Sequence, residues 1–271
     1  MLEIQHLTKR YGSKKAVDDL NLTIENGEVY GFIGHNGAGK TTTLKSIAGI
    51  HDFDEGDILI DGISIKKDPL ACKKKIAYIP DNPDMYDFMT GAKYLNFIAD
   101  IFQISTEDRK ERIQKYADAF ELTKDLDQPI ASYSHGMKQK LAIVSAWIHT
   151  PKLILMDEPF VGLDPKASHL LKQMMKEFCA EGNAIFFSTH VLEVAEKLCD
   201  KVAIIKNGKL IRSGTMEEVK GDTSLESVFL ELEGDKCKFW SNGAEFPIKV
   251  VQRFWNNGTS FTYERCAFFI L

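Results

Sequence analysis

The chain has 271 residues and a mass of 30.6 kDa, with 44% hydrophobic and 27% charged residues, the composition of an ordinary soluble globular protein. Its 34 basic and 39 acidic residues leave a formal net charge of −5, which argues against a nucleic-acid binder, since such proteins carry a basic excess. No stretch approaches the roughly 18 consecutive apolar residues of a membrane span, and the first residues do not have the pattern of a secretory signal, so neither is expected.

Short apolar runs alternate with helical patterns along the chain, and this alternation predicts an α/β fold. The candidate strands cover residues 2–4, 21–24, 28–33, 57–60, 153–156, 184–187 and 202–205. The later runs are bounded by polar or turn-forming residues, as are the buried strands of a sheet that is covered on both faces. We therefore expect a β-rich opening followed by a covered sheet.

The signal between residues 90 and 150 is helical. Three stripes repeat at helical spacing: Tyr94, Phe97, Ile98, Ile101 and Phe102; Ile113, Tyr116, Ala117 and Phe120; Leu141, Val144, Ser145 and Ile148. Such stripes usually pack in a core, so we expect core packing rather than a ligand groove. Ser105 and Asp108 mark the N-cap region of the second helix. The predicted organisation is an α/β body with an all-helical insertion at about residues 90–150.

A glycine-rich segment follows the apolar run 29–33 and precedes helix-compatible residues. It reads Gly34, His35, Asn36, Gly37, Ala38, Gly39, Lys40, Thr41 and Thr42, which fits the pattern G-x-x-x-x-G-K-[ST]. Glycines let consecutive backbone N–H groups turn inward around phosphate oxygens, and the following helix points its positive end at the anion. Lys40 can reach the β- and γ-phosphates, and the Thr41 hydroxyl can bind Mg²⁺. The strand–loop–helix context argues against an ordinary glycine-rich turn.

Two carboxylates end the apolar run 153–156. Asp157 suits Mg²⁺, as a direct ligand or through water. Glu158 is adjacent and is expected to point differently, as strand neighbours do, and it can act as a general base or orient an attacking water. A strand that ends in a solvated acidic turn is the alternative, and the phosphate-loop pattern upstream favours the catalytic interpretation.

Two further segments narrow the class of nucleotide-binding protein that the sequence indicates. Ser134, His135 and Gly136 place a small hydroxyl and free amides at the start of the third helical stripe, where a helix N-terminus can bind an anion; an ordinary helix cap is the alternative. His190 follows the candidate strand 184–187. At the end of a strand beside the acidic one, this histidine could touch a γ-phosphate, although a lone histidine is usually structural.

The order of these motifs resembles the nucleotide-binding subunit of ATP-binding-cassette (ABC) transporters over about residues 2–233. The matching segments are Tyr11 for the aromatic that stacks on adenine, Gly34–Thr42 for Walker A, Asp81 at the Q-loop, Ser134–Gln139 for the signature, Leu153–Glu158 for Walker B, Gly162–Asp164 for the D-loop and His190 for the switch histidine. The resemblance implies a P-loop NTPase cassette that uses ATP and Mg²⁺, with Thr41, Asp81 and Asp157 toward the metal and Glu158, His190 and Lys40 in catalysis.

Departures from the family pattern suggest a subclass. Tyr133, His135 and Met137 replace three of the five residues of the usual Leu-Ser-Gly-Gly-Gln signature, and Asp81 stands in place of glutamine. Asp81 is shorter and carries a charge, which leaves open whether it replaces the glutamine functionally. The motif combination is similar to bacterial ABC-2 and Ecs-type ATPases, which are associated mostly with export.

The resemblance also implies partners. A complete site needs two chains, in a homodimer or heterodimer, so that ATP lies between Walker A of one chain and Ser134, His135 and Gly136 of the other. A separate transmembrane permease subunit is expected to dock near Asp81 and the helical insertion. The chain would then be cytoplasmic and peripheral on the inner face of the membrane, in agreement with five cysteines that form no C-x-x-C pair. A soluble ABC ATPase for assembly or repair, and a binding module that hydrolyses little ATP, are the alternatives.

The last part of the chain, residues 234–271, is interpreted as an aromatic-rich tail outside the cassette. Nine of the 28 aromatic residues lie within 235–271. Residues 246–255 and 259–271, joined at Asn256-Asn257-Gly258, predict a β-hairpin because Asn-Gly favours a tight turn. Three interpretations remain open: a poorly ordered non-native tail, docking on a membrane partner, or packing on the α/β body.

Overall fold

The computed structural model describes residues 1–233. The chain divides into two units, residues 1–233 and 234–271, and the hairpin predicted at 246–271 lies outside the described residues. Everything below concerns the first unit. The assignment of the cassette to 2–233 and of a separate tail to 234–271 stays a prediction.

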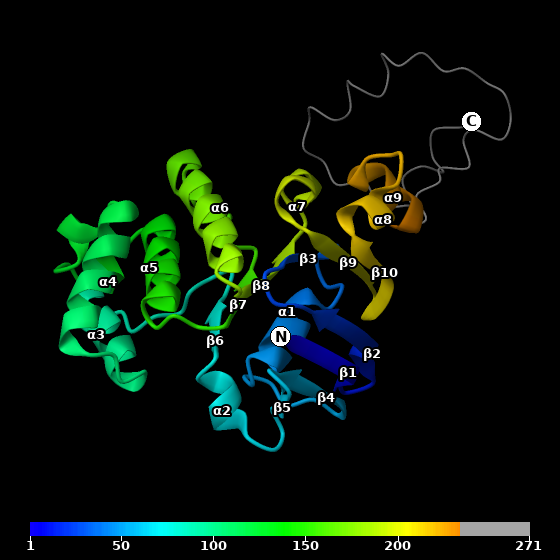
Figure 1. The fold of residues 1–271 in the computed structure, drawn as a ribbon, viewed down its shortest axis with the longest axis horizontal. Helices are drawn as coiled ribbons and strands as arrows, with labels where there is room; N and C mark the ends of the chain where they lie inside the picture. Colours follow the sequence, from blue (N-terminus) through cyan, green and yellow to red (C-terminus); the bar gives the residue numbers. More distant parts are fainter. Residues whose placement is uncertain (234–271) are drawn as a thin grey trace, which may run out of the picture. The chain divides into compact units, whose positions relative to one another are not determined.

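A six-stranded sheet runs through the described unit in the order β10-β9-β3-β8-β7-β6 (Figure 1). Five of its strands are parallel, and only β10 runs antiparallel, against β9. The strands are β3 (Val29–Ile33), β6 (Ile76–Ile79), β7 (Leu153–Asp157), β8 (Ala184–Thr189), β9 (Lys201–Lys206) and β10 (Lys209–Thr215). The sheet therefore contains the predicted strands of the second half and adds β6 and β10.

Each central strand of this sheet contributes to two separate hydrophobic cores. On β3, Val29 and Ile33 pack into one core, whereas Tyr30 and Phe32 pack into the other. Successive side chains of a strand point to opposite faces, so a strand covered on both sides must be apolar at every position. This requirement explains why β3 is apolar throughout, and why β7 and β8 are apolar up to the polar residues at their carboxyl ends.

A second, four-stranded antiparallel sheet has the order β2-β1-β4-β5. Its strands are β1 (Leu2–Tyr11), β2 (Lys14–Ile24), β4 (Glu55–Ile60) and β5 (Ile63–Ser64). Helix α1 (Lys40–Ile47) shares a core with both sheets, since its Leu44 and Ile47 are fully buried in the cluster that holds Leu20 and Phe32. The short helix α2 (Pro69–Lys73) begins at an Asp68 cap. The β-rich opening is thus confirmed.

Three helices form the insertion, grouped together in Figure 1: α3 (Gly91–Ile101), α4 (Thr106–Ala119) and α5 (His135–Ile148). Each begins at a hydroxyl cap, because Thr90, Ser105 and Ser134 accept backbone N–H bonds at the three N-termini. Short 3₁₀ turns, η1 (Thr123–Asp125) and η2 (Ile130–Ser132), join α4 to α5. The N-cap predicted near Ser105 is therefore confirmed.

The core predicted for α4 and α5 is largely confirmed, but the stripe on α3 is wrong in part. The fully buried positions of α3 are Leu95 and Ala99, which also stand four residues apart, whereas Ile101 is 56% exposed. Phe97 lies edge-to-face against Tyr86 at a 5.7 Å centroid separation. The helix has two adjacent apolar stripes, and spacing alone does not reveal which one faces the core.

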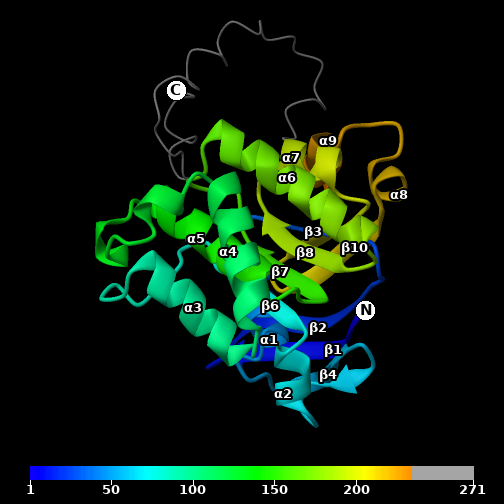
Figure 2. The same cartoon turned by 60° about the vertical axis from the view of Figure 1, so that its left-hand side comes forward.

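The remaining helices belong to the α/β body: α6 (Pro165–Ala180), α7 (Leu192–Leu198), α8 (Met216–Lys220) and α9 (Leu225–Glu233). Helix α6 contacts β8 and β3 and covers one face of the six-stranded sheet (Figure 2). Helix α9 buries Leu225 and Val228 in the core of the α/β body. Within residues 1–233, no helix is both long enough and apolar enough to cross a lipid bilayer.

The carboxyl ends of the parallel strands bring distant motifs to one edge of the sheet. The loop 34–39 leaves β3, Glu158 follows β7 and His190 follows β8. Open parallel sheets bind ligands at this edge. The topology therefore places the motifs where a bound phosphate can meet all of them.

Candidate nucleotide-binding site

The phosphate-loop segment 34–39 packs tightly against its surroundings. A Cβ atom on Gly39 would lie 2.5 Å from the carbonyl oxygen of Ala16, and one on Gly34 would lie 2.5 Å from that of Ile205. Gly37 and Gly39 also have left-handed φ angles of 81° and 115°, which residues with a Cβ rarely adopt. Space therefore requires glycine at 34, backbone conformation favours it at 37, and both requirements apply at 39.

Lys40 is held inside this loop. Its ammonium Nζ donates to the carbonyl oxygen of Gly34 at 2.5 Å and lies 3.4 Å from that of His35. The residue is only 6% exposed, and Nζ also lies 3.6 Å from Oε1 of Glu158. A buried cation is thereby fixed at the start of α1, where the helix dipole adds a positive potential.

Asp157 lies at the junction of the loop and the strand β7. Its Oδ2 accepts from the Thr41 hydroxyl at 2.6 Å, and its Oδ1 accepts from the Ser188 hydroxyl. Burial raises the pKa of Asp157, as do the negative charges of Asp81 and Glu158, while the two hydroxyl bonds lower the same pKa.

These residues fit Mg²⁺, which is usually held by one or two carboxylates together with substrate phosphates. The hydroxyl of Thr41 and the carboxylate of Asp157 are already hydrogen-bonded to each other. The carboxylate of Asp81 is close enough to act electrostatically on Asp157 and so adds a second negative charge to the site. Within the described residues no group of three or more His, Cys, Asp or Glu is arranged to hold a metal alone. A metal at this site therefore depends on phosphate oxygens as additional ligands.

Glu158 turns back toward the phosphate loop. Its φ angle of 47° is left-handed, so the chain leaves the extended path of β7 at this residue. Oε1 lies 2.9 Å from Nδ1 of His190, at an approach that makes no hydrogen bond, and the atom has no hydrogen-bond partner within residues 1–233. A buried carboxylate oxygen without a partner is uncommon, and here it faces the space where a phosphate would lie.

A cavity of about 290 Å³ occupies this position. Its lining includes most of the residues predicted from the sequence, namely Tyr11, His35, Asn36, Gly37, Gly39, Lys40, Thr41, Thr42, Asp81, Asp157 and Glu158. Gly34 and Ala38 lie in the same loop outside the lining, and the predicted His190 also lies outside it, beside Glu158. Tyr11 is 49% exposed and contacts His51 edge-to-face, and the Lys9 ammonium lies over its ring at 5.2 Å from the centroid.

Ser134, His135 and Gly136 do not line this cavity. Ser134 caps α5 by accepting from the Met137 amide at 3.2 Å and is exposed. The His135 ring covers Gly162 so closely that a Cβ there would lie 2.4 Å from its Cδ2 atom. The signature segment of a chain is therefore separate from the nucleotide cavity of the same chain.

Sequence reasoning missed three residues of the site. Lys14 and Ala16 line the cavity from β2, and Ser188 joins Asp157 to Glu158 from β8. None belongs to a phosphate-binding pattern. Ser188 stands two residues before His190 in the sequence, which is the one signal that could have identified it; Lys14 and Ala16 reach the site only through strand pairing.

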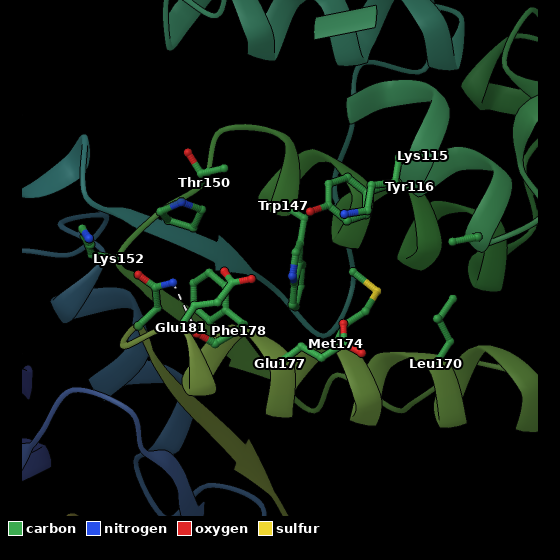
Figure 3. A pocket seen from close by; sticks show the side chains of 13 residues that line it. Lys115, Tyr116, Trp147, Thr150, Lys152, Leu170, Met174, Glu177, Phe178 and Glu181 are labelled. Atoms are coloured by element: carbon green, nitrogen blue, oxygen red, sulfur yellow. Dashed lines mark hydrogen bonds between the residues drawn. The ribbon is translucent and has the colours of Figure 1, made fainter. Parts of the chain in front are cut away.

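A larger cavity, of about 480 Å³, lies between α4, α5 and α6 (Figure 3). Trp147 and Phe178 form part of its wall, with ring centroids 6.0 Å apart, and none of the predicted site residues lines it. Its rim carries both acidic and basic side chains, from Glu177, Glu181, Lys115 and Lys152. Size alone does not make it the functional site, because the convergent phosphate-binding groups lie elsewhere.

A phosphate loop at the carboxyl edge of a parallel sheet, beside a strand that ends in two carboxylates, defines a P-loop nucleotide-binding protein. Comparison with known proteins supports this assignment to the nucleotide-binding proteins. The sequence profile of the family described as ABC transporter matches residues 17–161. The ABC-type transporter ATP-binding protein EcsA of Bacillus subtilis is 34% identical over 237 residues, which are 86% of this chain and 96% of that protein.

Two solved structures extend the comparison. An ATP-binding subunit of an ABC transporter superposes with a TM-score of 0.83 at 35% identity, over 86% of this chain and 99% of that one. A dimeric ATP-binding cassette in a post-hydrolysis state, bound to ADP and Pi, gives a TM-score of 0.73 at 25% identity, over 80% of this chain and 99% of that one. The chain belongs to the ABC transporter family, among its ATP-binding proteins.

Proposed function

We propose that this chain binds and hydrolyses ATP with Mg²⁺ and that a separate membrane subunit uses this cycle for transport, with export as the direction. The observation that carries the proposal is the convergence of Lys40, Asp157 and Glu158 at one cavity. Mg²⁺-dependent release of phosphate from ATP by the purified chain tests the hydrolysis. The export direction rests on the motif combination of the ABC-2 and Ecs-type subclass.

In this proposal the backbone N–H groups of 34–39 and the Lys40 ammonium bind the β- and γ-phosphates. Thr41 and Asp157, with Asp81 nearby, would hold Mg²⁺, which when bound neutralises charge on the phosphate oxygens. Tyr11 offers its exposed ring to the adenine base. Each of these contacts positions the triphosphate before the chemical step.

Glu158 is the proposed general base. Its Oε1, which has no hydrogen-bond partner within residues 1–233, lies beside Lys40 and His190, where it could accept a proton from a water molecule aimed at the γ-phosphorus. His190, whose Nδ1 lies 2.9 Å from Oε1 of Glu158, is the proposed donor to the γ-phosphate as negative charge develops. The short Lys40–Glu158 separation also keeps the base and the phosphate-binding cation in one rigid group.

A second copy or a close homologue of this chain would complete the site. Ser134 and His135 are exposed and Gly136 is partly buried at a helix N-terminus, and none of the three lines the cavity of its own chain, so a nucleotide held by another chain could approach them. The similar cassette bound to ADP and Pi is dimeric. We therefore propose a head-to-tail dimer with ATP between the two chains.

Replacing Ser134 with arginine is expected to leave ATP binding by the monomer within about twofold and to prevent the ATP-dependent dimer, because a long side chain would enter the space of the partner's phosphates. Size-exclusion chromatography with ATP measures the dimer. Ser105→Arg is the matched control, since Ser105 also caps a helix and each change costs about 1 kcal/mol of capping. An ATP-dependent dimer of Ser134→Arg would contradict the head-to-tail site.

An exposed aromatic cluster supports the membrane partner. Tyr86 and Phe88 are 48% and 81% exposed, and Tyr86 contacts Tyr94 and Phe97 of α3. An exposed apolar group of this kind marks an interaction surface. It lies between Asp81 and the helical insertion in the sequence, which is where a permease subunit is expected to dock.

The aromatic cluster is joined to the signature helix. Asp87, between the two exposed aromatics, forms an ion pair with Lys138 of α5 at 2.7 Å, and its carbonyl oxygen accepts from the Ala131 amide. Because α5 begins at His135, a displacement of the aromatic cluster would move the signature segment with it. This connection is a physical route from ATP-dependent closure to a docked membrane protein.

Replacing Phe88 with glutamate is expected to reduce the fraction of the chain that sediments with host membranes by about tenfold, since a charge would be buried at the interface, while ATP hydrolysis by the purified chain stays unchanged. Leu70→Glu is the matched control, because Leu70 is 63% exposed on α2. Equal membrane binding by wild type and Phe88→Glu would contradict docking here. A wild-type chain that never binds membranes would favour the soluble ATPase.

A further inference from the structure

Ser188 links the two acidic residues of the site through one hydroxyl. It lies on β8, paired in register with Asp157 of β7, and is 0% exposed. Its Oγ donates to Oδ1 of Asp157 and accepts from the backbone N–H of Glu158 at 3.1 Å. The buried hydroxyl thus donates to the last residue of β7, Asp157, and accepts from the residue that follows the strand, Glu158.

The second bond holds an unusual backbone conformation. In a continuing strand, Glu158 would point to the sheet face opposite Asp157. Its φ of 47° is instead left-handed, and its side chain lines the same cavity as Asp157, with Oε1 3.6 Å from Lys40 Nζ. Such a conformation is costly for a residue with a Cβ and persists only where neighbouring groups hold it. Here Oγ and the carbonyl oxygen of Ser188, at 3.1 and 3.2 Å, share the Glu158 amide.

The first bond orients the carboxylate of Asp157. Ser188 occupies Oδ1, so Oδ2 is the oxygen that faces Thr41 at 2.6 Å. A buried carboxylate with only the Thr41 bond would be free to rotate about its Cβ–Cγ bond. The hydroxyl therefore fixes which oxygen is directed toward the start of α1.

We propose that Ser188 is a positioning residue that fixes the carboxylate orientation of Asp157 and the backbone conformation of Glu158 at the same time. The proposal rests on the proposed ATP hydrolysis and adds a residue outside the phosphate-loop, acidic-strand and histidine motifs. One hydroxyl couples the orientation of the metal-side carboxylate to the direction of the proposed base. Displacement of a reacting group by about 1 Å can reduce a rate about 100-fold, so a small change in the position of either carboxylate is expected to have a large kinetic effect.

Ser188→Ala is expected to lower kcat for ATP by about tenfold to 100-fold, with KM for ATP within about twofold, and to raise the Mg²⁺ concentration needed for half-maximal rate. ADP affinity in EDTA, measured by calorimetry, is expected to match wild type and shows that the variant is folded. Ser46→Ala is the matched control, because the Ser46 hydroxyl is also buried but donates only to the Thr42 carbonyl. Ser188→Thr, which keeps the hydroxyl, is expected to recover most of kcat.

Wild-type kcat and Mg²⁺ dependence in Ser188→Ala would overturn the proposal. An equal loss of kcat in Ser46→Ala would overturn it too, since a general packing defect would then explain both variants. If the proposed ATPase function is wrong, the wild-type chain itself shows no Mg²⁺-dependent hydrolysis, which is a different result from wild-type behaviour of Ser188→Ala. Failure of the present inference appears only in the comparison of variants.

Discussion

Glu158→Gln is expected to reduce ATP hydrolysis by at least about 100-fold, the lower range for loss of a general base, without weakening ATP binding. Glutamine has nearly the same shape but cannot accept the proton of the attacking water. Lys40 keeps its bond to the Gly34 carbonyl oxygen and Thr41 its bond to Asp157, so the triphosphate is expected still to bind. Since hydrolysis no longer releases the closed state, an ATP-bound dimer is expected to accumulate.

Single-turnover hydrolysis measures the rate, and size-exclusion chromatography with ATP measures the dimer. Glu193→Gln provides the control, because Glu193 is an exposed residue of α7 that pairs with Lys197 at 2.7 Å and does not line the nucleotide cavity. A Glu158→Gln protein that turns over at the wild-type rate would show that another group is the base. Loss of ATP binding in the same variant would show that the substitution damages the loop itself.

Lys40→Ala is expected to weaken ATP binding by about 10- to 100-fold. Charge-assisted hydrogen bonds contribute about 1.5–3 kcal/mol, and about 1.4 kcal/mol corresponds to a factor of ten in affinity. The ammonium is already held in the loop by the Gly34 carbonyl oxygen, so little conformational entropy is lost when phosphate binds. Removal of this side chain also leaves Glu158 without its nearby cation.

Calorimetric titration with ATP in the presence of Mg²⁺ measures this affinity. Lys45→Ala is the control, because Lys45 lies in the last turn of the same helix, away from the loop, and carries the same charge. An unchanged affinity in Lys40→Ala would contradict the assignment of 34–42 as the phosphate-binding segment. A loss shared by Lys45→Ala would indicate a damaged helix rather than a lost phosphate contact.

Much of the candidate site could be predicted because its chemistry is concentrated in contiguous segments. Residues 34–42 carry the loop, the cation and the hydroxyl together, and Asp157 and Glu158 are neighbours at the end of one strand. The structure brings these segments to a single cavity. Lys14, Ala16 and Ser188 were missed because their positions follow from strand pairing, which local sequence patterns do not encode.

The full length of β1 could not be predicted from the sequence, because the backbone of this strand is irregular. Only residues 2–4 were expected, whereas β1 runs to Tyr11. Its pairing with β2 shifts register between Ile4 and Leu7, and His6 has a left-handed φ of 50°. A bulge of this kind inserts an extra residue and breaks the alternation of buried and exposed positions, on which the strand prediction depends.

The two hydrophobic cores share strands β3, β7, β8 and β9 as a common wall. Neither core can therefore melt while the other stays intact, since loss of the wall exposes apolar surface on both sides at once. Unfolding of the α/β body is expected to be cooperative, and the amides of this wall belong to the last group to exchange with solvent. The phosphate loop, the acidic pair and His190 all leave this wall at its carboxyl edge, so they are anchored to the thermodynamically most persistent part of the chain.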